Sequence, residues 1–134
     1  MRGHARNIMT ERVKAITPNT PLPEIATTLV GQGFGGVPVV DDSDFVIGFV
    51  SEIDLVDALL RDDSHEALAK DIMSSPAITI DEFAPADEAM TVLRECGIHH
   101  LPVVREGRLV GIIAPVDVLR FYVDHLLPKP PEAG

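Results

Sequence analysis

The chain has 134 residues, which is room for one compact domain of ordinary size, and each half alone would be only marginally stable. It carries 11 Lys and Arg against 21 Asp and Glu, so its formal net charge of −10 disfavours nucleic-acid binding through phosphate neutralisation. Apolar residues make up 46% of the chain, but no run is long enough to span a bilayer or form a signal peptide, and a single cysteine excludes an internal disulfide. We therefore expect a cytoplasmic protein that binds neither nucleic acid nor a membrane.

The first half predicts the element order strand, helix, strand, strand, helix. Apolar residues in 21–32 recur every three or four positions, which indicates a helix with one buried face, capped by Thr20 and ended by Gly31 and Gly33. The apolar face is expected to consist of Leu22, Ile25, Ala26, Leu29 and Val30. The other predicted elements are a strand over 13–17, a hairpin of strands 37–40 and 45–50 joined by the acidic turn 41–44, and a helix over 52–60.

The second half predicts the same order after a polar, partly helical linker at 61–70. The expected elements are a strand over 77–80, a helix over about 85–96, a hairpin of strands 101–104 and 109–113, and a helix from Pro115 to about His125. The last residues, 127–134, are rich in proline and are expected to form a frayed tail.

Three segments recur between the halves at nearly constant spacing. Residues 7–9 return as 71–73 and residues 33–40 as 97–104, both 64 positions later, while residues 48–54 return as 111–117, 63 positions later. One residue has therefore been inserted in the first hairpin. A repeat of this length indicates a duplicated supersecondary unit. We expect the two units to share one core and to form two equivalent clefts, whose differences then decide what each cleft binds.

Together, in this order and twice, these segments closely resemble a tandem pair of CBS domains, named for cystathionine β-synthase. The resemblance covers residues 7–124 and carries an Ile-Met opening, a Gly-to-Pro-Val-Val segment and a Gly-apolar-apolar-Ser-x-x-Asp segment. It implies a mixed α/β (α+β) fold of two β-α-β-β-α units packed through their sheets about a pseudo-twofold axis. The expected parts are a first repeat over 7–61, a linker over 62–70, a second repeat over 71–126 and a flexible tail over 127–134.

Ser51 and Asp54 are the first residues expected to hold a ligand. Both fall in the first turn of a helix that follows a strand, where a carboxylate suits the vicinal hydroxyls of a ribose. The same spacing is that of a helix cap, and the two roles can coexist. In the second repeat Ala114 and Pro115 replace polar groups while Asp117 remains, so we expect the second cleft to be weak, empty or differently selective.

By resemblance, an apolar slot for the base is formed by the first strand and the Gly-rich segment, including Lys14, Ala15, Ile16, Val37 and Pro38. His99 and His100 fall where relatives place His or Arg near phosphates, and the first repeat has Gly35 and Gly36 at the matching places. Because neighbours along a strand point to opposite faces, we expect one of the two histidines to reach a given cleft. Their titration near neutral pH would make polyphosphate binding pH-sensitive. A core or surface role stays open for these residues.

Catalytic and metal-binding patterns are absent from the sequence. No Gly-x-Ser-x-Gly elbow, P-loop or His-Glu-x-x-His occurs, so we expect no enzymatic activity. No Cys-x-x-Cys accompanies Cys96, and adjacent histidines diverge, so we expect no metal site.

The expected function is a regulatory module that binds AMP, ADP, ATP or a related adenosyl ligand and senses the energy or metabolite state for an unidentified partner protein. The alternative is a ligand-free dimerisation or scaffold module, in which Ser51 and Asp54 only cap their helix. Apolar residues on both faces of the last helix favour this alternative, with Val116, Leu119 and Val123 on one face and Val118, Phe121 and Tyr122 on the other. In either case we expect a homodimer.

Overall fold

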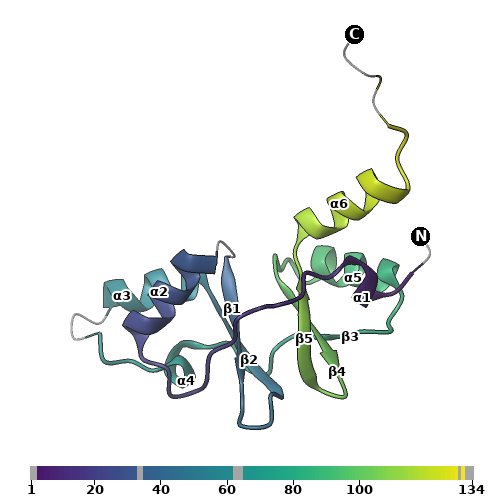
Figure 1. Ribbon diagram of the computed structural model, residues 1–134. Helices are drawn as coiled ribbons and strands as arrows, with labels where there is room; N and C mark the ends of the chain where they lie inside the picture. The colour runs from purple at the N-terminus through teal and green to yellow at the C-terminus, as the bar shows by residue number, and fades with distance from the viewer. Residues whose placement is uncertain (1–2, 33–34, 62–64, 130, 132–134) are drawn as a thin grey trace.

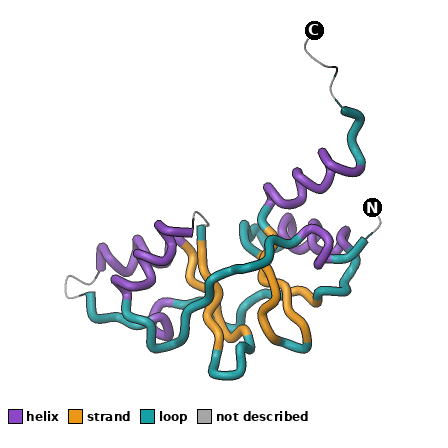
Figure 2. Tube along the Cα trace, in the orientation of Figure 1, coloured by secondary structure: helices purple, strands orange, loops and turns teal. Residues whose placement is uncertain are grey.

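The computed structural model describes residues 3–32, 35–61, 65–129 and 131. Two β-hairpins lie side by side at the centre, and helices flank them on both sides (Figures 1 and 2). Along the chain the elements are α1 (Ala5–Ile8), α2 (Leu22–Gln32), β1 (Gly36–Val40), β2 (Val46–Ser51), α3 (Glu52–Arg61), α4 (Ala69–Ile72), β3 (Ile80–Asp81), α5 (Ala86–Glu95), β4 (Leu101–Arg105), β5 (Arg108–Ile113) and α6 (Pro115–His125). Within these described ranges, none of the helices has both the length and the apolar character needed to traverse a bilayer.

The four long helices confirm the predicted ranges. α2, α3, α5 and α6 begin and end within one residue of the predicted positions. The predicted cap at Thr20 is wrong, because Thr20 Oγ1 accepts the Thr17 N–H at 3.0 Å and α2 begins only at Leu22. Leu22, Ile25 and Leu29 are buried as predicted, but Val30 is 86% exposed. Val30 lies at the edge of the apolar stripe, where the helix surface has already turned toward solvent.

Three predictions fall partly outside the described residues. These are Gly33 as the end of α2, residues 62–64 of the linker, and residues 130 and 132–134 of the tail. The described part of the linker, residues 65–67, has no regular secondary structure and leads to α4, which is a single helical turn.

Both predicted hairpins are present, but the strands expected to precede them are shorter than predicted. β1 pairs antiparallel with β2, and β4 pairs antiparallel with β5. The strand expected over 13–17 is reduced to a parallel bridge between Ile16 and Val39, and the strand expected over 77–80 is the two-residue β3, parallel to β4. Only the end of each predicted strand runs alongside its own hairpin, because Thr10 and Ser74, a few residues earlier, pair with the hairpin of the other repeat.

Each leading segment crosses from one hairpin to the other. Thr10 forms an antiparallel pair with Ile112 of β5, and the chain then reaches β1 at Ile16. The equivalent segment of the second repeat crosses in the opposite direction. Its Ser74 pairs with Phe49 of β2 before the chain reaches β4 through β3. The two crossing segments therefore tie the hairpins together.

The two hairpins also meet directly, at a point of pseudo-twofold symmetry. Phe45 and Arg108, which occupy equivalent positions in the two repeats, form an antiparallel bridge with each other. The amides of the next residues, Val46 and Leu109, each donate to the carbonyl before the bridge residue of the opposite hairpin, both at 3.1 Å. The predicted packing of two units about a pseudo-twofold axis is confirmed.

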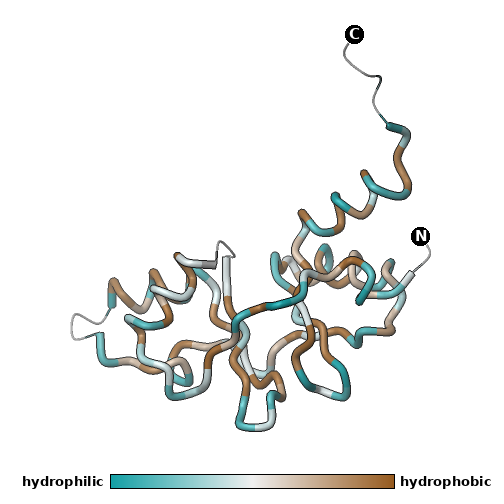
Figure 3. The backbone as a smooth tube through the Cα atoms, viewed as in Figure 1, coloured by the Kyte–Doolittle hydropathy of each residue, from teal (hydrophilic) through white to brown (hydrophobic). Residues whose placement is uncertain are grey.

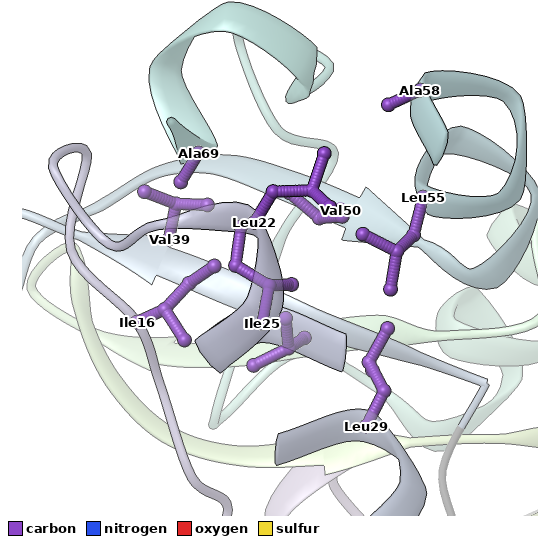
Figure 4. Packing of buried hydrophobic residues seen from close by; sticks show 10 residues of the cluster. Ile16, Leu22, Ile25, Leu29, Val39, Val50, Leu55, Ala58 and Ala69 are labelled. Carbon is purple, nitrogen blue, oxygen red and sulfur yellow. The ribbon is translucent and has the colours of Figure 1, made fainter. Parts of the chain in front are cut away.

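Two clusters of buried residues form, one in each repeat. In the first, α2 and α3 pack on the hairpin, and Leu22, Ile25 and Val50 are completely buried at the centre of the cluster (Figure 4). The second cluster has the same plan around Leu101 and Val103 of β4. The single core expected from the chain length is therefore wrong, because each hairpin carries its own helices on one face.

The two cores exchange their first helical turns. Ala5 and Ile8 of α1 lie at the opening of the first repeat but are buried in the second cluster, and Ala69 of α4 is buried in the first. The Ala5 N–H donates to the Ala84 carbonyl at 2.8 Å, and the Ala69 N–H donates to the Thr20 carbonyl at 2.9 Å. In Figure 1 the N-terminal segment runs from α1, beside α5, across the hairpins to α2. Each repeat therefore needs a segment from the other to complete its core.

This exchange explains two of the recurring motifs. Met9 lies over Gly111 of β5 and Met73 lies over Gly48 of β2, and a Cβ atom at either glycine would collide with the methionine sulfur. These strand positions require glycine because another segment passes close to their backbone. The Ile-Met motif of each repeat therefore packs on the Gly-apolar-apolar motif of the other repeat.

Candidate functional site

A cleft of about 760 Å³ opens between the two repeats. Its walls come from the β2–α3 junction, from the crossing segment before β3 and from the loop between α5 and β4. The described residues that line it are Gly35, Phe49, Ser51, Glu52, Ile53, Asp54, Ser74, Pro76, Ile78, Gly97, Ile98, His99, His100 and Pro102. The cleft thus brings Ser51 and Asp54 of the first repeat together with His99 and His100 of the second.

Ser51 and Asp54 form a reciprocal cap at the start of α3. The Asp54 N–H donates to Ser51 Oγ at 3.1 Å, and the Ser51 N–H donates to Asp54 Oδ2 at 3.1 Å. Both residues are half-buried, and both line the cleft. Among the described residues, Asp54 Oδ1 has no hydrogen-bond partner, and the Ser51 hydroxyl keeps its own proton to donate. Capping therefore leaves one acceptor and one donor for a molecule in the cleft.

The equivalent carboxylate of the second repeat is saturated by internal partners. Asp117 is 2% exposed, and its Oδ1 accepts hydrogen bonds from Thr10 Oγ1 at 2.7 Å and from Arg120 Nη1 at 2.9 Å. Its Oδ2 accepts from the Ala114 N–H at 2.7 Å. Asp117 is therefore fixed in place, whereas Asp54 has an unused oxygen. This difference supports the prediction that a ligand binds more weakly in the cleft of Asp117 than in the cleft of Ser51 and Asp54.

His100 joins the two repeats at the wall of the cleft. The Gly35 N–H donates to His100 Nε2 at 3.1 Å, and the imidazole stacks on the Phe49 ring with centroids 5.8 Å apart. Burial, followed by the neighbouring His99, lowers the pKa of His100, and the opposing effect of nearby carboxylates is smaller. His100 is therefore a neutral hydrogen-bond acceptor at pH 7 rather than a cation for phosphate.

Both histidines line the cleft, so the expectation that only one of them would reach it is wrong. That expectation assumed a strand at residues 99 and 100, where successive side chains alternate between faces. β4 begins only at Leu101, and the loop before it has no such alternation.

Three residues expected in the slot for the base lie elsewhere. A separate pocket of about 430 Å³ is lined, among others, by Lys14, Ala15 and Ile16. The wall beside Ser51 comes instead from the equivalent segment of the second repeat, which contributes Ser74, Pro76 and Ile78. The cause is the crossing of the leading segments, which places the segment after Ser74, and not the one after Thr10, next to β2.

Of the described residues of the Gly-rich segment, 35–40, only the first lines the cleft. Gly35 lines the cleft, whereas Gly36, Val37 and Pro38 are buried within β1. Further lining residues were not predicted, namely Phe49, Glu52, Ile53, Ser74, Pro76, Ile78, Gly97, Ile98 and Pro102. The repeat gives a sequence signal for three of these residues: Ser74, Pro76 and Ile78 occupy the positions equivalent to Thr10, Arg12 and Lys14. That they line this cleft follows only from the crossing of the leading segments in the folded chain.

The cleft offers hydrogen-bonding groups and apolar walls rather than a metal-binding arrangement. Within the part of the chain that the structure describes, no three His, Cys, Asp or Glu side chains converge as a metal ion would require. Cys96 is exposed and carries a free thiol.

The sequence is similar to a known protein family and to several curated proteins. A profile of the family described as CBS domain matches residues 5–61 and 69–124. Among curated proteins, the chain is 36% identical over 107 residues to an uncharacterized protein of Methanopyrus kandleri, a match that covers 78% of this chain and 55% of that protein. The chain spans about half the length of the first curated relatives that it matches.

Solved structures share the fold over nearly the whole chain. CBSX2 from Arabidopsis thaliana, in complex with AMP, has a TM-score of 0.81 and 25% identity, and the match covers 90% of this chain and 96% of that one. Hypoxic Response Protein I of Mycobacterium tuberculosis, with two coordinated zinc ions, has a TM-score of 0.80 and 26% identity, with 94% and 100% covered. With its two matched repeats and this fold, the chain belongs to the CBS domain family, as a tandem pair.

Proposed function

We propose that the chain is a regulatory module that binds an adenosine-containing ligand in the cleft lined by Ser51 and Asp54. The observation that carries this proposal is the unused Oδ1 of Asp54 beside the Ser51 hydroxyl, in a cleft with an aromatic ring and apolar walls. A carboxylate suits ribose hydroxyls, and an apolar slot suits a purine base. The AMP complex of the similar protein CBSX2 supports this ligand class. AMP, ADP, ATP and related adenosyl compounds are the ligands to test.

Regulation follows from the position of the cleft between the repeats. A ligand held by Ser51 and Asp54 also meets the loop at 97–100 and the crossing segment at 74–78, so it contacts both repeats at once. Binding therefore favours one relative arrangement of the repeats over others, and a partner protein can read that change on the surface. No catalytic step is required for this role.

Titration with AMP tests the proposal. A ligand that binds only the folded chain raises the free energy of unfolding by about 2.7 kcal/mol at a hundredfold excess over Kd, which shifts the melting temperature by several degrees. Differential scanning fluorimetry of the full chain measures this shift. The absence of a shift with millimolar AMP, ADP, ATP, 5′-methylthioadenosine and S-adenosylmethionine would refute the proposed function.

We also propose that two copies associate through α3 and α6. On each helix, three apolar residues with the spacing i, i+3 and i+7 face solvent, and these are Ile53, Val56 and Leu60 on α3 and Val116, Leu119 and Val123 on α6. The two sets occupy equivalent positions in the repeats, while the other face of α6 packs on the second core through Val118 and Phe121. α6 extends away from the hairpins with apolar and polar residues alternating along it (Figure 3). Two symmetry-related apolar stripes suit a twofold contact with a second copy.

Substitution of Leu119 by glutamate is expected to convert a dimer into a monomer. Leu119 is 64% exposed, so the change places a charge in the proposed contact without disturbing a core. Analytical ultracentrifugation compares this variant with wild type and with Leu127→Glu, an exposed leucine beyond the end of α6 that serves as the matched control. A wild-type chain that sediments as a monomer, or equal loss of the dimer in both variants, would contradict this contact. A wild-type dimer that binds no adenosyl compound would instead favour the scaffold alternative.

A further inference from the structure

The ionisable side chains among the described residues that line the cleft are two carboxylates and two histidines. Glu52 and Asp54 contribute two carboxylates, and the described residues that line the cleft include no lysine or arginine. His100 accepts a hydrogen bond from the Gly35 amide at Nε2, and burial lowers its pKa, so it is neutral at pH 7. His99 is an exposed residue of the same cleft. The chain around it carries a formal net charge of −10.

The amides at the start of α3 are also used internally. A helix N-terminus is a common site for phosphate because its first N–H groups lack partners. Here the Ser51 N–H donates to Asp54 Oδ2 at 3.1 Å, the Glu52 N–H donates to the Gly35 carbonyl at 2.8 Å, and the Asp54 N–H donates to Ser51 Oγ at 3.1 Å. Three of the four amides from Ser51 to Asp54 are therefore already paired, and little capacity remains for an anion.

Glu52 lies where the two repeats approach each other. A Cβ atom built on Gly35 would lie 2.6 Å from Glu52 Oε1 and 2.8 Å from His100 Cε1. The Glu52 carboxylate therefore sits against Gly35, close to the His100 ring and on the wall of the cleft. A polyphosphate that enters the cleft would meet this negative charge, whereas an uncharged or positively charged group would not be repelled.

We infer that the cleft selects adenosyl ligands whose 5′ substituent carries no net negative charge, such as a thioether or a sulfonium, over nucleoside di- and triphosphates. This inference rests on the proposed function and specifies the chemistry of the ligand at the same site. Asp54 and Ser51 recognise the sugar, which all adenosyl ligands share. Glu52 and the occupied amides of α3 discriminate at the 5′ position, where the ligands differ.

Calorimetric titration of the full chain with four ligands measures this selectivity. The ligands are 5′-methylthioadenosine, S-adenosylmethionine, AMP and ATP, in magnesium-free buffer at pH 7.5. We expect 5′-methylthioadenosine and S-adenosylmethionine to bind at least about tenfold more tightly than ATP, because like charges inside a cleft disfavour the wrong partner. Raising the salt concentration should narrow the difference, since screening weakens the repulsion of ATP.

The substitution Glu52→Gln identifies the group responsible. It should strengthen ATP binding roughly 3–10-fold while leaving 5′-methylthioadenosine within about twofold of wild type. Glu66→Gln is the matched control, because it makes the same change in net charge at an exposed loop residue outside the cleft. This control should leave the affinities for both ligands unchanged.

Each contrary outcome has a distinct meaning. If ATP binds more tightly than 5′-methylthioadenosine, the selectivity is wrong and the proposed function stands. If Glu66→Gln strengthens ATP binding as much as Glu52→Gln does, the repulsion comes from the net charge, and the assignment to the cleft is overturned. If none of the four ligands binds, the proposed function itself fails and this inference fails with it.

Discussion

Replacement of Asp54 by asparagine is expected to lower the affinity for an adenosine ligand by roughly 10–100-fold, with little change in stability. Asparagine keeps a carbonyl oxygen that can accept the Ser51 N–H, so the cap of α3 persists. The other carboxylate oxygen becomes an amide group, and the acceptor that faces the cleft is lost. A hydrogen bond to a charged group contributes about 1.5–3 kcal/mol, which corresponds to the expected range. Isothermal titration calorimetry with AMP measures the change.

Asp57→Asn is the matched control for this variant. Asp57 lies on the same helix but outside the cleft, and it pairs with Arg61 at 2.9 Å on the surface, so the control makes the same change in net charge. We expect its affinity for AMP to equal that of wild type. Equal affinity in the Asp54 variant would show that this carboxylate does not hold the ribose. Equal loss in both variants would assign the effect to net charge.

Truncation of Ile8 to alanine is expected to lower the free energy of unfolding by about 2–4 kcal/mol. Ile8 is 5% exposed, and although it belongs to the first repeat it packs in the core of the second. The lost methyl groups leave a cavity in that core, which the surrounding hairpin and helices fill only in part. Urea denaturation followed by circular dichroism measures the loss, and Val30→Ala, at an exposed apolar position of α2, should stay within about 0.5 kcal/mol of wild type.

The shape of the unfolding curve tests the exchange of helical turns between the repeats. Because each core contains a segment from the other repeat, both repeats of the Ile8 variant should unfold in one transition at a lower urea concentration. Two separate transitions, or an Ile8 variant as stable as the Val30 control, would show that the first turn does not complete the second core.

The difference between the two equivalent carboxylates, Asp54 and Asp117, has a simple electrostatic cause. The second repeat has Arg120 one turn after its carboxylate, and this guanidinium together with Thr10 occupies Asp117 Oδ1. The first repeat has Asp57 at the position equivalent to Arg120, so no cation from its own helix neutralises Asp54. The carboxylate that remains available for a ligand is therefore the one whose neighbour in the helix is acidic.

Much of the fold could be predicted from the sequence because its signals are local. Apolar residues at helical spacing, Pro115 at a helix start, and turn residues between alternating runs are read from a few neighbouring positions, and they located four helices and two hairpins. The duplication added the pseudo-twofold relation, because two copies of one unit place equivalent residues such as Phe45 and Arg108 at equivalent points. The same signals marked Ser51 and Asp54 as a cap, which the reciprocal hydrogen bonds confirm.

By itself, the sequence determined the elements, their order, their repetition and the types of side chain available for a ligand. The tertiary structure decided which of these side chains meet: it brought Ile78 rather than Lys14 to the cleft, closed Asp117 onto Thr10, and made His100 a neutral acceptor for Gly35. The physical reason is that these contacts join residues tens of positions apart through crossing segments. Whether a carboxylate is open or an imidazole charged depends on burial and on partners that only the folded chain supplies.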